Sequence, residues 1–319
     1  MLSNTRAAIF ALIAYGIFST HDVIVKFVSE TQSAFQIVFF SSLLSFPLLT
    51  LMMVGDKTIG NLRPKYPGWT VLRSLIIPFI PASAFYAFSV LPLAQAYALL
   101  FATPLLITLL SIPVLKERVG VQRLAAVGVG FIGVLVVLRP GGTELGLGHA
   151  AALLAALGNA TQSVILRKVS NEERAIVLML YPMLGTVALM GLTLPFVYVP
   201  LEAAELGGLA VVALFGFCAT LLVVKAYTIG EAATVAPMQY SQIIWATLYG
   251  SLLFGEDVDA MTLTGAAIII ASGIFIVLRE ARGGRSDNTP VLNTRSRAVT
   301  SGGANVSLMV RLRQRQKTD

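Results

Sequence analysis

Three ionisable side chains, His21, Asp22 and Lys26, stand at the end of an apolar run that begins near Ala7. This segment reads STHDVIVKFVSE over residues 19–30. An ionisable group inside a membrane helix is costly, which makes it a candidate for function by default. Imidazole titrates near neutral pH, and desolvation lets a carboxylate take up a proton more readily. We therefore predict that His21 and Asp22 exchange protons or contact a solute.

The placement of this pair has two interpretations. Adjacent helix positions point about 100° apart, so we expect one of the two side chains to face a cavity and the other to meet a neighbouring helix. In the alternative, both lie at the outer interface and are wetted, with Lys26 extending to the lipid headgroups. The two interpretations differ in how deeply the pair is buried.

A predicted helix over 233–254 carries amide and aromatic side chains that suit a planar polar solute. Gln239 and Gln242 are three residues apart and share one helix face, which Trp245 extends. Hydrogen bonding between helices, worth about 0.6 kcal/mol on average in membranes, is the alternative. The predicted substrate contacts on this helix are Gln239, Tyr240, Gln242 and Trp245.

A predicted helix over 93–114 contains Pro104, which frees a backbone carbonyl and kinks the helix. Such a kink either exposes polar backbone to a cavity or serves packing alone. Polar side chains surround this proline, and two weaker candidates lie on neighbouring predicted helices. The further predicted substrate contacts are Tyr97, Thr103, Gln95, Tyr86 and Asn159.

Three other charged residues are predicted to have structural roles. Arg73 lies near the cytoplasmic end of a predicted helix over 70–90, and we interpret it as an interface anchor, with a substrate clamp as the alternative. Glu117 and Glu256 each stand a few residues before a new predicted helix, where a carboxylate accepts backbone N–H groups and favours the positive end of the helix dipole. We therefore expect both glutamates to cap these helices.

The amino-acid composition indicates that most of the chain is surrounded by lipid. Hydrophobic residues make up 56% and charged residues 12% of the 319 residues, so lipid must replace water around most of the chain. The single cysteine, Cys218, excludes a disulfide framework and a cysteine metal site. The sequence contains no metalloprotease or serine-hydrolase motif, so we expect no enzyme, no metal and no cofactor.

Apolar stretches of about 20 residues, enough to cross a hydrocarbon core of about 30 Å, predict an all-α integral membrane protein with ten transmembrane helices. The predicted spans are 7–27, 34–54, 70–90, 93–114, 121–139, 147–168, 175–198, 207–228, 233–254 and 261–279.

The distribution of basic residues predicts the orientation. With the N-terminus in the cytoplasm, Lys26 and Arg139 are the only basic residues of the spans and turns that fall outside. The outer turns carry acidic residues instead, such as Glu202 and Glu256. The net charge of +7 therefore reflects topology and not nucleic-acid binding. We predict a multi-pass protein of the inner, cytoplasmic membrane with both termini cytoplasmic and a disordered basic tail over 282–319.

An internal repeat divides the chain. Residues 160–171 read ATQSVILRKVSN and match STHDVIVKFVSE, with Arg167 in place of Lys26. Glu117 and Glu256 also occupy equivalent places in the two halves. Because each half holds five predicted spans, an odd number, the second half enters the membrane in the opposite sense, as in many transporters. The predicted domains are a first repeat over 1–140, an inverted second repeat over 141–281 and the tail over 282–319.

The two copies of the segment differ in charge. Gln162 and Ser163 stand in the second copy where the first copy has His21 and Asp22. Because the second copy folds without charge at these positions, folding alone does not require the charged pair. We therefore predict a functional use, and proton binding that differs between two conformational states is the simplest one.

Two pairs of segments resemble the repeats of EamA-type carriers in the drug/metabolite transporter superfamily. The first pair is AYALLFATPLLITLLSIPVLKERVG with GVGFIGVLVVLRP, and the second is APMQYSQIIWATLYGSLLFGED with GAAIIIASGIFIVLRE. The resemblance covers about residues 6–280 and implies a ten-helix carrier that works by alternating access. It also implies a central cavity lined by helices three, four, eight and nine and their neighbours. The superfamily moves amino acids, nucleotide-related metabolites, vitamins, S-adenosylmethionine, sugars and drugs, so the resemblance says little about the substrate.

The sequence thus predicts a secondary transporter for a small organic metabolite, such as a vitamin like riboflavin, an amino acid or a nucleoside-like solute. Export of drugs or toxic metabolites is the alternative, and a channel or a membrane scaffold fits the inverted halves less well. Protons are the candidate coupling partner, and a monomer and a homodimer are both compatible with the sequence.

Overall fold

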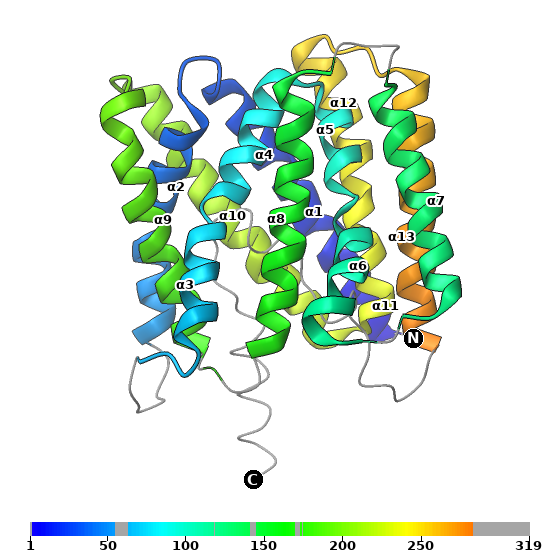
Figure 1. Cartoon of the computed structure of the whole chain (residues 1–319). Helices are drawn as coiled ribbons and strands as arrows, with labels where there is room; N and C mark the ends of the chain where they lie inside the picture. The colour runs from blue at the N-terminus through cyan, green and yellow to red at the C-terminus, as the bar shows by residue number, and fades with distance from the viewer. Residues whose placement is uncertain are drawn as a thin grey trace.

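The computed structural model describes residues 2–54, 63–117, 119–140, 145–169, 173 and 175–282, and the regular elements in these ranges are helices (Figure 1). The predicted tail lies outside the described residues except for Arg282. The helices of the first half are α1 Leu2–Val28, α2 Ala34–Val54, α3 Pro67–Ile76, α4 Phe79–Val90, α5 Leu93–Leu100, α6 Thr103–Leu115 and α7 Val121–Leu138. The helices of the second half are α8 Leu147–Val169, α9 Ala175–Val197, α10 Ala203–Ile229, α11 Ala232–Val235, the 3₁₀ helix η1 Ala236–Ser241, α12 Gln242–Phe254 and α13 Ala260–Arg282.

Eight helical segments in the described part of the chain are long and apolar enough to cross a membrane. Two of them, Pro67–Val90 and Leu93–Leu115, each run through two consecutive helices, α3 with α4 and α5 with α6. Large apolar side chains are exposed on the surface, for example Phe196 at 87% and Leu252 at 71%, which water would disfavour and lipid accepts. The chain is an all-helical, multi-pass membrane protein, as predicted.

Two of the predicted spans are not among these eight segments. The apolar stretch within α2 is shorter, Ala34–Leu48, and Pro47 lies inside this helix. The span predicted over 233–254 is divided by η1, which has Pro237 in its first turn. Proline has no N–H to donate, so a regular α-helical run is interrupted at this position.

The break predicted at Pro104 is present. α5 ends at Leu100, and Pro104 lies in the first turn of α6. The carbonyl of Leu100, which would accept the missing N–H of Pro104, instead accepts a hydrogen bond from Thr103 Oγ1 at 2.7 Å. The side chain of the preceding threonine therefore satisfies the carbonyl that the proline frees.

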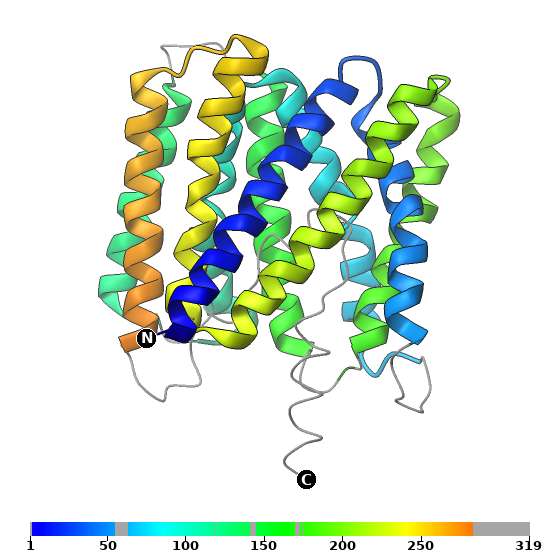
Figure 2. The same ribbon diagram turned by 180° about the vertical axis from the view of Figure 1, so that it is seen from behind.

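Helices from the two halves of the chain pack against each other. α1 runs along α10, and α13 runs along α7 (Figure 2). Between α1 and α10, Ala7, Ala11 and Ala14 share a buried cluster with Ala219 and Ala226, and these small side chains let the helices approach closely. The start of α1 and the end of α13 lie at the same end of the bundle, which we call the N-terminal end (Figure 1).

The contact between α7 and α13 depends on glycine. A Cβ atom added to Gly133 would lie 2.8 Å from the carbonyl oxygen of Gly265, and one added to Gly265 would lie 2.7 Å from that of Gly133. Both distances are too short for a carbon–oxygen contact. A Cβ atom on Gly128, in the same helix, would meet no atom within 4 Å.

Replacing Gly133 with alanine is therefore expected to destabilise the protein by about 1–3 kcal/mol, because the helices must move apart. Gly128→Ala is the matched control, and it should leave stability unchanged or slightly raised, because alanine is the better helix former. The midpoint of thermal unfolding in detergent measures both effects. Equal midpoints for the two variants would show that the α7–α13 contact does not require glycine.

Candidate functional site

A cavity that is partly open to solvent lies between α1, α4, α5, α6, α8, η1 and α12, and together with that open solvent it contains about 600 Å³ of space not filled by protein atoms. Its lining includes both proline-associated breaks, the junction of α5 with α6 and that of η1 with α12. The family resemblance implied a contribution from the predicted eighth helix, but no described residue of α10 lines the cavity, and α1 and α8 contribute instead. Seven residues predicted from the sequence line it: His21, Asp22, Tyr97, Thr103, Asn159, Gln239 and Gln242.

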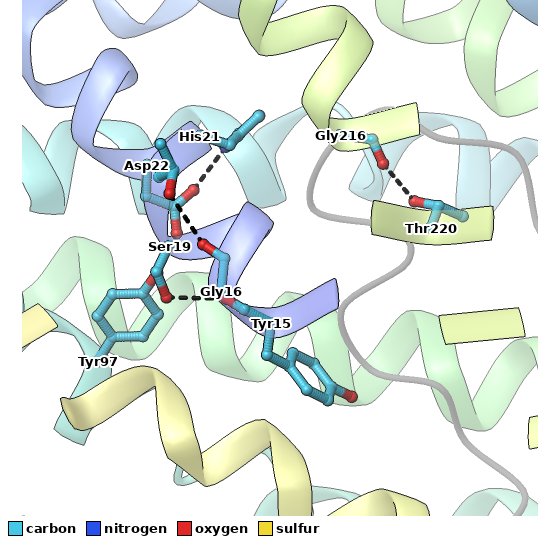
Figure 3. A network of polar contacts seen from close by, with 9 residues as sticks. Tyr15, Gly16, Ser19, His21, Asp22, Tyr97, Gly216 and Thr220 are labelled. Carbon is cyan, nitrogen blue, oxygen red and sulfur yellow. Dashed lines mark hydrogen bonds and ion pairs between the residues drawn. The ribbon is translucent and has the colours of Figure 1, made fainter. Parts of the chain in front are cut away.

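His21 and Asp22 are buried, each with 2% of its surface exposed, and they bond to each other. His21 Nδ1 lies 2.7 Å from Asp22 Oδ1, and the hydroxyl group of Tyr97 donates a hydrogen bond to Asp22 Oδ2 (Figure 3). The expectation that only one of the pair would face the cavity is wrong, because their side-chain torsions bring the imidazole to the carboxylate and both line the cavity. Their burial also contradicts a wetted position at the interface.

Aromatic side chains form much of the cavity wall. The His21 ring lies 6.4 Å from the ring of Phe18 and 6.0 Å from that of Phe85, measured between centroids. Sequence reasoning missed the phenylalanines, because a phenylalanine in an apolar run is equally suited to face lipid, a helix or a cavity. The aromatic residues of the wall are Phe18, Phe85, Phe88, Tyr97 and Phe101.

Three amide side chains, Asn159, Gln239 and Gln242, add hydrogen-bonding groups to the wall. Asn159 Oδ1 and Gln242 Nε2 are buried and have no hydrogen-bond partner among the described residues. Leaving such a group unpaired costs about 1–3 kcal/mol. The cavity therefore presents one acceptor and one donor that a polar solute or water would satisfy.

The charge of the cavity lining is also one-sided when His21 is neutral, since this histidine is charged only if protonated. Asp22 is the only carboxylate among its lining residues, and neither lysine nor arginine occurs among the described residues that line it. Aromatic rings attract cations through their negative faces. The wall is therefore better suited to a positively charged group than to an anion.

Four predicted contact residues lie away from the cavity lining. Tyr240 is buried, and its ring centroid lies 5.1 Å from that of Phe101. Trp245 is half-buried and stacks on Tyr249, with 6.0 Å between the ring centroids. The helix face that was expected to run from Gln239 through Gln242 to Trp245 is not continuous, because η1 interrupts it. Gln95 Nε2 lies 3.1 Å from His149 Nε2 and lines a separate pocket. Tyr86 is exposed, with 38% of its surface accessible. The four residues are Tyr240, Trp245, Gln95 and Tyr86.

An ion pair joins Lys26 to Glu256 at the end of the bundle opposite the N-terminal end. Lys26 Nζ also donates to the carbonyl of Leu91 at 2.8 Å, and the backbone N–H of Leu93 donates to Glu256 Oε2 at 2.8 Å. The expectation that Lys26 reaches the headgroups is therefore wrong. Glu256 does not cap α13 either, because Asp259 Oδ2 accepts the N–H of its first turn.

The equivalent residues form a second ion pair at the N-terminal end, where Arg167 Nη2 lies 2.5 Å from Glu117 Oε1. Glu117 Oε2 has no hydrogen-bond partner in the described part of the chain. The predicted capping role of Glu117 is wrong, because α7 begins at Val121 and its N-cap position, Gly120, has no side-chain cap. The sequence repeat aligned Lys26 with Arg167 and Glu117 with Glu256. It did not indicate that each basic residue forms an ion pair with the glutamate of the other half.

Arg73 is fully buried and not at an interface, so its prediction as an anchor is wrong. Only 2% of its surface is exposed, and its guanidinium donates to Gln162 Oε1 and to the carbonyl of Leu178. The reason is that α3 packs on both α8 and α9, which cover the arginine.

The helices surround a cavity, and ion pairs lie at the two opposite ends of the bundle, an arrangement that suits a membrane transporter. Two segments of the chain, residues 5–139 and 146–278, match the model of the EamA-like transporter family. The chain belongs to the EamA-like transporter family, which confirms the resemblance noted in the sequence. The predicted function class, a transporter of a small metabolite, is confirmed as well.

Relatives with named substrates occur in several bacteria. The S-adenosylmethionine uptake transporter of Rickettsia prowazekii (strain Madrid E) is 28% identical over 267 residues, which cover 83% of this chain and 90% of that protein. The riboflavin transporter of Vibrio cholerae serotype O1 is 28% identical over 236 residues, covering 72% and 79% of the two chains. One solved crystal structure shares the fold, with a TM-score of 0.56 and 21% identity over 88% of this chain and 99% of the other.

Proposed function

We propose that this protein is a secondary transporter that moves a small, planar and positively charged metabolite across the cytoplasmic membrane by alternating access. The observation that carries the proposal is the cavity around Asp22, with its aromatic wall, the unpaired amide atoms of Asn159 and Gln242, and Asp22 as the one carboxylate among the described residues that line it. These groups suit a heteroaromatic ring that carries a cationic substituent. S-adenosylmethionine, named for the Rickettsia relative, has both features. Riboflavin is the second candidate, because the aromatic wall also suits its flat ring.

The proposed architecture is ten membrane crossings in two inverted repeats, 1–140 and 141–281. In this scheme α1 corresponds to α8, α3 with α4 to α10, and α5 with α6 to the segment from α11 to α12. The packing supports the scheme, because exchanging corresponding helices turns one observed contact into another: α1 with α10 becomes α8 with α4, and α1 with α12 becomes α8 with α6. The contact of α7 with α13 is unchanged by the exchange.

The two ion pairs fit this symmetry and suggest how access alternates. Exchanging the repeats turns Lys26–Glu256 into Arg167–Glu117, and the pairs lie at opposite ends of the bundle. We propose that each pair holds its end closed and that the pairs open in turn. The N-terminal end, where Glu117 Oε2 has no partner among the described residues, is the less fully bonded end.

In the proposed orientation the N-terminal end faces the cytoplasm. The start of α1 and the end of α13 both lie there, and so do Arg167 and Lys168 in the last turn of α8. Basic residues concentrate on the cytoplasmic side of membrane proteins. Because one chain encloses the cavity, the proposal requires no partner subunit, and it includes no catalysis and no cofactor.

Uptake into proteoliposomes tests the proposed function directly. Radiolabelled S-adenosylmethionine, riboflavin, tryptophan and a nucleoside would be compared with and without a pH gradient. The proposal expects saturable S-adenosylmethionine uptake that responds to the gradient, because His21 and Asp22 are proposed to bind protons. Absence of saturable uptake for all four solutes would contradict it.

Replacing Gln242 with alanine is expected to weaken substrate binding about tenfold, since a buried amide donor to the solute is lost. Gln95→Ala is the matched control, because Gln95 bonds to His149 away from the cavity lining. Competition for labelled substrate on purified protein measures both affinities. Equal losses in the two variants, or none in Gln242→Ala, would place the binding site elsewhere.

A further inference from the structure

Arg73 is a buried cation that bonds to no carboxylate in the described part of the chain. Its guanidinium donates to Gln162 Oε1 and to the carbonyl of Leu178, each at 3.3 Å, and its Nε has no acceptor. Charge-assisted hydrogen bonds to carboxylates are shorter, about 2.7–2.9 Å. A buried charge is unfavourable unless it is paired, so this arrangement lacks the anion that would balance it.

The arginine lies close to the cavity, toward the N-terminal end of the bundle. Its partner Gln162 follows Asn159 by three residues on α8, a rise of about 4.5 Å along the helix. Asn159 lines the cavity. Gln162 Nε2, like Arg73 Nε, is buried without a hydrogen-bond partner among the described residues. Two unpaired donors therefore lie about one helical turn beyond the cavity lining.

We propose that Arg73 and Gln162 bind a carboxylate group of the substrate as it passes between the cavity and the N-terminal end. A guanidinium binds a carboxylate through two parallel N–H donors, and Nε with one Nη forms such an edge. Asp22 in the cavity offers the opposite charge, so the complete path suits a substrate with a cationic group and a carboxylate. This inference rests on the proposed function and refines its substrate class to amino-acid-like metabolites.

Two solutes that differ only in the carboxylate test the inference. S-adenosylmethionine carries an α-carboxylate, and its decarboxylated analogue lacks it. The wild-type protein in detergent should bind S-adenosylmethionine at least about tenfold more tightly than the analogue, because a charged hydrogen-bonded pair is gained. Arg73→Gln should abolish this preference and leave the affinity for the analogue unchanged, which also shows that the variant is folded. Arg73→Lys should retain part of the preference.

Arg279→Gln is the matched control, since it removes an exposed cation from α13 and should keep the wild-type ratio of affinities. A wild-type protein that binds both solutes equally, or an Arg73→Gln variant that keeps the preference, would overturn the carboxylate site and leave the proposed transport function intact. A wild-type protein that binds neither solute would overturn the proposed substrate itself, and the inference with it.

Discussion

Asp22→Asn is expected to reduce substrate uptake about a hundredfold while the protein remains folded. The carboxylate accepts hydrogen bonds from the side chains of His21 and Tyr97 and is the only carboxylate that lines the cavity among the described residues. Asparagine keeps the size of the side chain and one acceptor, but it removes the negative charge that would attract a cationic solute. Bonds to charged groups contribute about 1.5–3 kcal/mol each, and 1.4 kcal/mol corresponds to a factor of ten.

The same substitution should flatten the pH dependence of uptake, because it removes one partner of the buried His21–Asp22 pair that is proposed to bind protons. The titratable side chains that line the cavity are His21, Asp22 and Tyr97, and α4 contributes only Ala84, Phe85 and Phe88 to the wall. His21→Gln should flatten the profile in the same way. Both effects are read from initial uptake rates in proteoliposomes at a series of pH values.

Tyr97→Phe serves as the comparison variant, because it removes one hydrogen bond to Asp22 and leaves the charge. It should lower uptake only about tenfold and retain the pH profile. A wild-type rate that does not change with pH would refute proton coupling. Wild-type uptake by Asp22→Asn would refute the role of the carboxylate in binding.

The fold class was predictable because lipid leaves a simple signature in the sequence. Long apolar runs and the proline at Pro104 indicated the helices and one of their breaks. The break at η1 was missed, since the signal of Pro237 is shared by prolines that interrupt a helix and by prolines that only bend it. The count of ten crossings remains a prediction, because length and hydropathy alone identify eight segments among the described residues.

The candidate site was predictable where a residue is unusual for a membrane helix. His21, Asp22 and Asn159 are polar in apolar surroundings, and the structure places all three at one cavity. Arg73 was unusual too, but its role was misjudged because its depth depends on how α3 packs against α8 and α9. Contacts between distant helices, such as Lys26 with Glu256, could not be read from one sequence, because repeat symmetry matches residues without showing which pairs touch.

Neutralising the two ion pairs one at a time is expected to shift the equilibrium between the two open states of the protein in opposite directions. The side chains of Lys26 and Glu256 are each 12% exposed, and those of Arg167 and Glu117 are 14% and 6% exposed, so solvent screens both pairs only partly. Loss of such a pair removes an ion pair from one end of the bundle, and a change of 1.4 kcal/mol alters the ratio of two states tenfold. Lys26→Gln should therefore favour opening at the outer end, and Arg167→Gln opening at the N-terminal end.

Both variants are expected to slow transport at least about tenfold, because a carrier locked toward one state completes fewer cycles. The double variant should recover part of the rate, since the two ends are again balanced. Arg279→Gln, which removes an exposed basic residue of α13, serves as the control. Uptake rates that fall equally in the single and double variants would indicate a folding defect instead of a shifted equilibrium.

The most direct test of alternating access measures the reactivity of one cysteine in the cavity from both sides of the membrane. Leu100 lines the cavity, and Leu100→Cys would be introduced with Cys218→Ala, which removes the only native cysteine. A membrane-impermeant thiol reagent would be applied to right-side-out and inside-out vesicles. The reference is the protein that carries only Leu100→Cys and Cys218→Ala. Added to it, Lys26→Gln is predicted to raise the labelling rate from the outside about tenfold, and Arg167→Gln the labelling rate from the cytoplasmic side about tenfold. Labelling that rises from the same side in both variants, or in neither, would contradict the proposal that the two ion pairs close opposite ends of the cavity.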